Sequence, residues 1–252
     1  MIYSGIFLHE HGYYSTHWID SAIKRQQKWC DSIDQEYRLI KDIPWGMNYP
    51  LRHSWCYGTL IKFVALYDFL QSDESHFTWI DLDVYPEDTA MGYCLPDDNI
   101  LYAPMVSPDF SEAPGHEHMR AKKIWCGHTT DYYALNTGMY KLSYEAAVSL
   151  WDFINNRALG PASGPITQTL WWEIYKKKQL DFSTDQPWLY GTEEAITEDW
   201  LNEEIQLNES LPEHRHVKFT QLSETIHSVH PENKPLFLHY HGPRKHEYPL
   251  QI

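Results

Sequence analysis

The chain has 252 residues, enough to bury one large hydrophobic core, and no Gly/Ser- or Pro-rich linker divides it. Its formal net charge of −15 argues against a protein that grips the phosphate backbone of nucleic acids through clustered Lys and Arg. We therefore expect a single domain over residues 1–252 and no nucleic-acid partner.

The hydrophobic pattern predicts alternating strands and helices along the chain. Residues 1–8 read as a first strand, 16–29 as an amphipathic helix and 37–43 as a second strand, which is a βαβ opening. Ser54 is expected to cap a helix over 55–70. The later elements expected are strands at 77–80, 100–106, 132–142 and 236–240, and helices at 144–156, 168–178 and 193–204. This alternation indicates an α/β fold.

Residues 107–130 are rich in Pro, His, Glu and Lys and show little periodicity. Long connections of this kind in compact domains are often functional. We expect a surface loop over the active site.

The cysteines and the first residues bear on localisation. Four widely spaced cysteines form no Cys-x-x-Cys pair, so neither a zinc ribbon nor a redox motif is indicated, and free thiols in a reducing compartment are expected. The chain starts without the basic region of a signal peptide, and no stretch approaches the roughly 20 apolar residues that a membrane span needs. A soluble, cytoplasmic protein is the expectation.

The first of four short motifs is Trp79-Ile80-Asp81-Leu82-Asp83. An apolar, β-branched and aromatic run precedes the two carboxylates, which are expected to emerge where the strand ends, at the edge where open α/β sheets bind ligands. Mg²⁺ or Mn²⁺ is commonly held by one or two carboxylates together with substrate phosphates. The motif predicts a divalent metal site.

Three further motifs follow in order. Asn136-Thr137-Gly138 lies within a strand pattern, where a glycine either permits close approach of a ligand or marks an ordinary bulge. Asp185-Gln186 offers polar groups to sugar hydroxyls, or caps a helix. In the element His239-x-x-Gly242-x-x-Lys245, the glycine permits a tight turn that returns the lysine toward a metal-bound anion, although a solvated basic tail has the same composition.

Together these motifs resemble the GT-A glycosyltransferases, most closely the retaining, family 8-like group that includes glycogenin. The resemblance implies a single GT-A (Rossmann-like) domain with a mixed, mostly parallel sheet flanked by helices. It implies that Asp81, Asp83 and His239 bind Mn²⁺ or Mg²⁺. It also implies donor-binding roles for Lys62, Asn136, Gly138, Gly242 and Lys245, and catalytic roles for Asp185, Gln186 and Lys245.

The function expected from the resemblance is transfer of a sugar from a nucleoside diphosphate sugar, UDP more than GDP, to a glycan or other acceptor hydroxyl, with retention. An inverting enzyme would need a general base, for which Asp185, Glu193 and Glu194 are candidates. Two alternatives stay open. One is a phosphatase of the haloacid-dehalogenase type, with Asp81 as nucleophile and Asp83 as acid; the other is a binding protein that keeps the GT-A fold without turnover.

Overall fold

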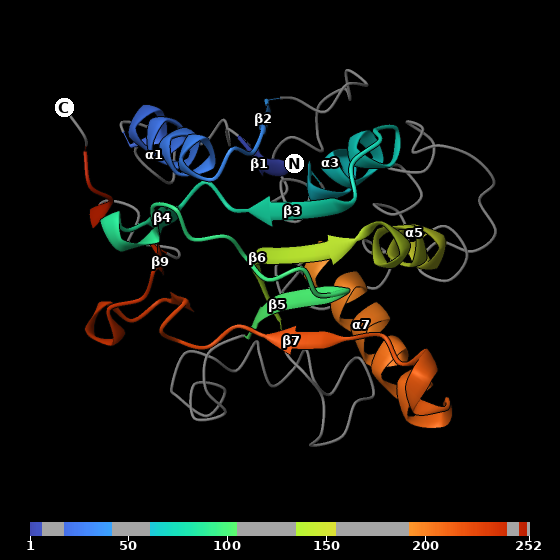
Figure 1. Cartoon of the computed structure of the whole chain (residues 1–252). Coiled ribbons are helices and arrows are strands. Elements are labelled where there is room, and N and C mark those ends of the chain that lie inside the picture. The colour runs from blue at the N-terminus through green and yellow to red at the C-terminus, as the bar shows by residue number, and fades with distance from the viewer. Residues whose placement is uncertain (7–17, 42–60, 105–134, 155–191, 241–246, 251–252) are drawn as a thin grey trace, which may run out of the picture.

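A six-stranded sheet runs through the described part of the protein (Figure 1). The computed structural model describes residues 1–6, 18–41, 61–104, 135–154, 192–240 and 247–250. Strand β6 is antiparallel to both of its neighbours, and the other strands of the sheet share one direction. The expected α/β class with a mixed, mostly parallel sheet is therefore confirmed. The strand order is β2 (Tyr37–Ile40), β1 (Ile2–Gly5), β3 (His76–Ile80), β6 (Leu135–Ser143), β5 (Ile100–Pro104) and β7 (Phe219–Gln221).

A second, smaller sheet lies beyond the carboxyl end of β3, which points toward it in Figure 1. Its strand order is β4 (Val84–Pro86), β9 (Phe237–His239) and β8 (His227–Ser228). Strand β9 is antiparallel to β4 and parallel to β8. The chain thus passes from β3 directly into the small sheet, and the motif with Asp81 and Asp83 is the link between the two sheets.

Two layers of apolar side chains cover the faces of the main sheet. Alternate residues of one strand point to opposite faces, so Tyr3 packs in one cluster while Ile2 packs in the other. The first cluster includes side chains from α3 (Ile61–Leu70), α5 (Tyr144–Phe153) and α7 (Thr192–Ser210). The second joins α1 (Ile19–Ser32) and the small sheet. Burial on both faces explains the nearly continuous apolar strands.

The helix boundaries differ from the expected ones by a few residues. Helix α1 begins at Ile19 and continues to Ser32, because Trp29 and Cys30 extend its buried stripe. Helix α5 begins at Tyr144 as predicted, where Ser143 Oγ accepts a hydrogen bond from the Ala146 amide. Helix α7 runs on to Ser210. The predicted helix at 168–178, the loop at 107–130 and the start of the helix at 55–70 lie outside the described residues.

Strands β4, β7 and β8 were not predicted, because two or three residues are too short to show a hydrophobic period. Among the helices that the structure describes, none is both long and apolar enough to cross a lipid bilayer.

Candidate metal centre

The turn between β3 and β4 holds the two aspartates. The Asp81 amide donates to the Gly138 carbonyl at 2.7 Å, which extends the pairing of β3 with β6, and the Val84 amide closes the turn onto the Asp81 carbonyl at 3.0 Å. Gln26 of α1 fixes this turn from the other side, because its Nε2 donates to the carbonyls of Asp81 at 2.8 Å and Val84 at 3.0 Å. Tyr37 in turn donates to Gln26 Oε1 at 3.0 Å.

Sequence reasoning missed Gln26. The available signal was a polar residue on the buried stripe of α1, where it is fully shielded from solvent. Buried amides are nearly always hydrogen-bonded, so such a position predicts a specific partner without saying which one.

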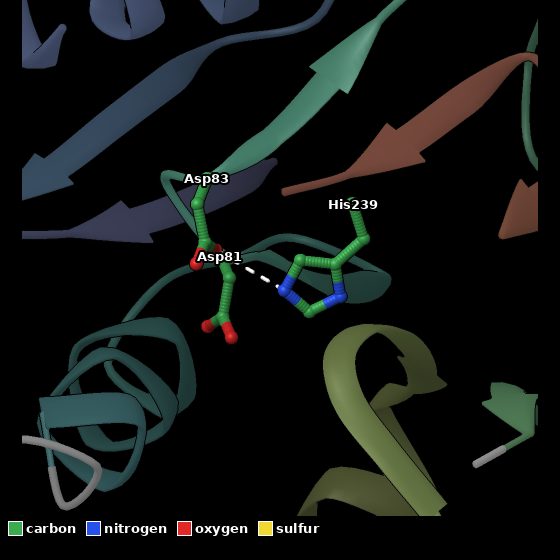
Figure 2. A group of neighbouring side chains, drawn as sticks. All are labelled: Asp81, Asp83 and His239. Carbon is green, nitrogen blue, oxygen red and sulfur yellow. Dashed lines mark ion pairs between the residues drawn. The ribbon is translucent and has the colours of Figure 1, made fainter. Parts of the chain in front are cut away.

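His239 reaches the same place through the pairing of β4 with β9. Val84 lies opposite His239 in the antiparallel register, and the Tyr240 amide donates to the Asp83 carbonyl at 2.9 Å. The imidazole of His239 therefore lies beside Asp83, with Nε2 3.2 Å from Asp83 Oδ1 (Figure 2). Both residues are buried, with 2% and 5% of their surface exposed.

Asp81, Asp83 and His239 point toward one another (Figure 2), and each offers a ligand atom within 4.8 Å of those of the other two. We call these residues the triad. Two carboxylates held this close repel each other unless a cation lies between or beside them. Carboxylate oxygens with one imidazole are ligands suited to a divalent cation such as Mn²⁺ or Mg²⁺. The residues present therefore fit the metal site that the sequence predicted.

Lys62 adds a fixed positive charge to the triad. Its ammonium is buried, lies 3.3 Å from Asp81 Oδ1, and donates to Thr137 O at 2.8 Å and to Thr137 Oγ1 at 2.9 Å. Trp79 Nε1 donates to the same Asp81 oxygen at 2.6 Å. The described contacts of Lys62 orient a member of the triad, and its donor-binding role stays a prediction.

The motif at 136–138 lies at a β-bulge. The register of β5 against β6 shifts between Tyr102, which pairs with Tyr140, and Ala103, which pairs with Asn136. This bulge turns the Thr137 carbonyl toward Lys62, while Gly138 receives the Asp81 amide. The motif therefore forms a β-bulge, as one of the two interpretations expected. Thr137 and Gly138 of this bulge hold Lys62 and Asp81 in place. The side chain of Asn136 is not described.

Asp185, Gln186, Gly242 and Lys245 lie outside the described residues. Their roles remain predictions.

A buried aromatic cluster holds the end of β9. Tyr240, which follows His239, packs on Tyr248 at 5.2 Å and on Tyr85 at 6.4 Å between ring centroids, and Trp18 packs on Tyr248 at 5.4 Å. Arg25 of α1 lies over the Tyr85 ring at 4.6 Å. Segment 247–250 is thereby anchored to α1 and β4, beside the triad.

His227 is a second buried histidine that sequence reasoning missed. Its ring lies 5.4 Å from that of His239, with a tilt of 60°. Burial and the neighbouring His239 lower the pKa of His227 to about 3, against a smaller opposing effect of Asp83. The imidazole is therefore neutral at neutral pH.

Neither a protein-family model nor a curated protein matches the chain. Solved structures do. A glycosyltransferase involved in the glycosylation of the major capsid of PBCV-1 aligns with 98% of this chain and 95% of its own, at 17% identity and a TM-score of 0.46. Galactosyltransferase LgtC in complex with donor and acceptor sugar analogs aligns with 96% of this chain and 87% of its own, at 13% identity and a TM-score of 0.42.

An active-site mutant of LgtC aligns over the same shares of the two chains, at 11% identity and a TM-score of 0.41. These structural neighbours are glycosyltransferases. At such identities and scores the likeness does not assign a function to this chain.

Proposed function

We propose that this protein is a metal-dependent glycosyltransferase that moves a sugar from a nucleoside diphosphate sugar to an acceptor hydroxyl. UDP is the proposed nucleotide in preference to GDP, and Mn²⁺ in preference to Mg²⁺. We further propose that residues 1–252 form one GT-A domain in which 107–130 closes over the bound donor. A reducing, cytoplasmic location is part of the proposal; of the cysteines that the structure describes, Cys30 and Cys94 are free thiols.

One observation carries the proposal: the triad converges at the carboxyl end of β3, although its members come from two distant parts of the sequence. Ligands of open α/β sheets bind at this edge. A carboxylate pair with an imidazole suits a metal that also takes phosphate oxygens, and the buried Lys62 suits a site for an anion.

The proposed chemistry breaks the bond between the anomeric carbon and the diphosphate and forms one to the acceptor oxygen. Asp81, Asp83 and His239 would hold the metal, which when bound supplies Lewis-acid stabilisation of the departing diphosphate. Trp79 and Lys62 fix the orientation of the Asp81 carboxylate before any ligand arrives. Such preorganisation lowers the barrier because no side chain must reorient during the reaction.

The roles proposed for the undescribed residues follow the resemblance. Lys245 would add positive charge at the diphosphate, and Asn136 would contact the donor sugar. Gln186 and Asp185 would lie near the anomeric carbon. In the retaining reaction that we propose, the acceptor approaches on the side of the leaving group. Proton NMR of the product made from an α-linked donor tests this, since a β-linked product would refute retention.

A phosphatase of the haloacid-dehalogenase type is the second candidate, and it explains fewer of the residues at the site. That scheme uses Asp81 and Asp83 and gives no role to His239, whose Nε2 lies 3.2 Å from Asp83 Oδ1. The acid assigned to Asp83 would have to donate a proton, whereas Asp83 lies against His239. A binding protein without turnover would have no need for this arrangement of two carboxylates, an imidazole and a buried lysine.

The test is a screen of nucleotide sugars for Mn²⁺-dependent release of the nucleoside diphosphate. Activity should disappear with EDTA and return with excess Mn²⁺. Asp83→Asn should abolish turnover while the protein stays folded, and Asp73→Asn, which changes an exposed carboxyl on the loop before β3, should leave turnover unchanged. Full activity of Asp83→Asn at saturating Mn²⁺ would refute the assignment of the metal.

A further inference from the structure

Among the residues that the structure describes, Nε2 of His227 has no hydrogen-bond partner, and this residue is only 3% exposed. An unpaired buried polar group costs about 1–3 kcal/mol, and nearly all such groups in folded proteins are paired with protein, water or a ligand. A leucine or phenylalanine would fill the same space in the core without this cost. The histidine therefore indicates a partner that binds there.

The position of His227 points to the metal centre. Strands β8 and β9 are parallel, with His227 opposite Phe237, so His227 and His239 lie on the same face of the small sheet. Their ring centroids are 5.4 Å apart, and Asp83 is close enough for its charge to act on the His227 ring. His227 therefore lies beside His239, which itself lies against the buried Asp83.

We propose that His227 is a fourth protein ligand of the metal centre, together with Asp81, Asp83 and His239. The inference rests on the proposed function only in assigning a divalent metal to the triad. An imidazole nitrogen binds such a metal at about 2.1 Å, which puts the ring centroid about 3.2 Å from the ion. Two rings on one ion at a roughly tetrahedral angle then have centroids about 5 Å apart, close to the observed 5.4 Å.

The ligand atoms of His227 do not share the 4.8 Å group formed by the other three residues. Binding therefore requires a rotation of the His227 ring, and no hydrogen bond of Nε2 has to break for it. The consequence is a change in metal preference. Two imidazoles and two carboxylates favour Mn²⁺, Co²⁺ or Zn²⁺ over Mg²⁺, which prefers oxygen ligands.

The experiment is pulsed electron paramagnetic resonance of the full chain with Mn²⁺ alone, without nucleotide, after labelling histidine with ¹⁵N. The wild-type spectrum should contain hyperfine couplings from two imidazole nitrogens. His227→Phe and His239→Phe should each leave one. The Kd for Mn²⁺ should rise about 10- to 100-fold in His227→Phe, while the much weaker Mg²⁺ binding changes less.

His230→Phe is the matched control, because His230 lies three residues away, is half exposed and pairs with Glu232. It should keep both couplings and the wild-type Kd. A single coupling in the wild-type protein, or failure of Mn²⁺ to bind, would overturn the inference even if no His227 variant folds. Sugar transfer is measured separately: turnover with one nitrogen coupling would overturn this inference alone, whereas two couplings without turnover would refute only the proposed function.

Discussion

The ammonium of Lys62 lies 3.3 Å from the carboxylate of Asp81, so a buried lysine pairs with a partly exposed carboxylate that is a proposed metal ligand. The charge of Lys62 acts in two ways. It stabilises the negative charge of Asp81, which the nearby carboxylate of Asp83 repels. It also repels a cation that binds to Asp81. The two effects are separable by experiment.

Lys62→Met should lower the melting temperature of the metal-free protein, because the substitution leaves the Thr137 oxygens and Asp81 without the ammonium that pairs with them. The rise in melting temperature at saturating Mn²⁺ should be larger in Lys62→Met than in the wild type, because the competing charge is gone. Differential scanning fluorimetry with and without Mn²⁺ measures both. A smaller rise would show that Lys62 mainly orients Asp81 for the metal.

Gly5→Ala should destabilise the fold by about 1–3 kcal/mol, the usual cost of inserting a methyl group into a packed core. A Cβ at Gly5 would lie 2.9 Å from the Trp79 ring and 3.1 Å from two atoms of Ile61. Because Trp79 donates to Asp81, the displacement should also weaken Mn²⁺ binding. Urea unfolding and a Mn²⁺ titration check the two effects.

Gly92→Ala is the comparison for Gly5→Ala. Gly92 has φ +79° and open space around it, so its substitution should cost about 1–2 kcal/mol through backbone strain alone. Mn²⁺ affinity should stay at the wild-type value. If Gly5→Ala also bound Mn²⁺ normally, the packing of Trp79 would not control the orientation of Asp81.

Cys30 should resist alkylation in the native protein, whereas Cys94 should react. Burial, with a smaller contribution from Asp31, raises the pKa of the Cys30 thiol to about 12, and its side chain has no contact with solvent. The reactive thiolate is therefore scarce at pH 8. Treatment with iodoacetamide at pH 8, followed by peptide mass spectrometry, should find Cys94 modified and Cys30 modified only after denaturation. Equal rates for the two residues would mean that α1 opens readily.

Asp98→Asn should destabilise the protein at pH 7 by about 1.5–3 kcal/mol, the range for hydrogen bonds to a charged group. Burial on its own would raise the pKa of Asp98, but the contacts with Lys218 and Thr220 outweigh it and hold the pKa below its usual value. The stabilisation is therefore present above the unfolded-state pKa of about 3.9 and is lost as the pH falls below it.

Urea unfolding of wild type and Asp98→Asn from pH 8 to pH 3 tests this pH dependence. The difference in unfolding free energy should stay constant down to about pH 5 and shrink below about pH 4. Asp73→Asn, at an exposed site, is the control. A difference that persists at pH 3 would mean that the carboxylate charge is not what stabilises the fold.

The grouping of Asp81, Asp83 and His239 was expected from the family resemblance of the four motifs taken together, and the structure brings the three side chains together. Taken alone, an apolar strand that ends in two aspartates, or a histidine near the end of another apolar run, has ordinary structural explanations; the order of the motifs joined them. The main strands and helices were predictable because hydrophobic periodicity over several turns or strand residues is a local property.

Three residues near the triad, Gln26, Gly5 and His227, were not predictable. Gln26 acts through a turn that follows it by more than fifty residues, and the constraint on Gly5 comes from the side chains of Trp79 and Ile61. His227 stands in a strand of two residues, which is too short for any periodic signal. In each case tertiary packing determines the partner, and the partner cannot be predicted from the spacing of residues in the sequence.

The pairing of Val84 with His239 has a consequence for biosynthesis. A ribosome that has made β3 and β4 has exposed both aspartates, but most of the chain must still be translated before His239 can join them. Contacts between such distant positions form late, because closing a long loop lowers the conformational entropy of the chain before the contact adds any stability. The complete three-residue site would therefore form only after β9 has paired with β4.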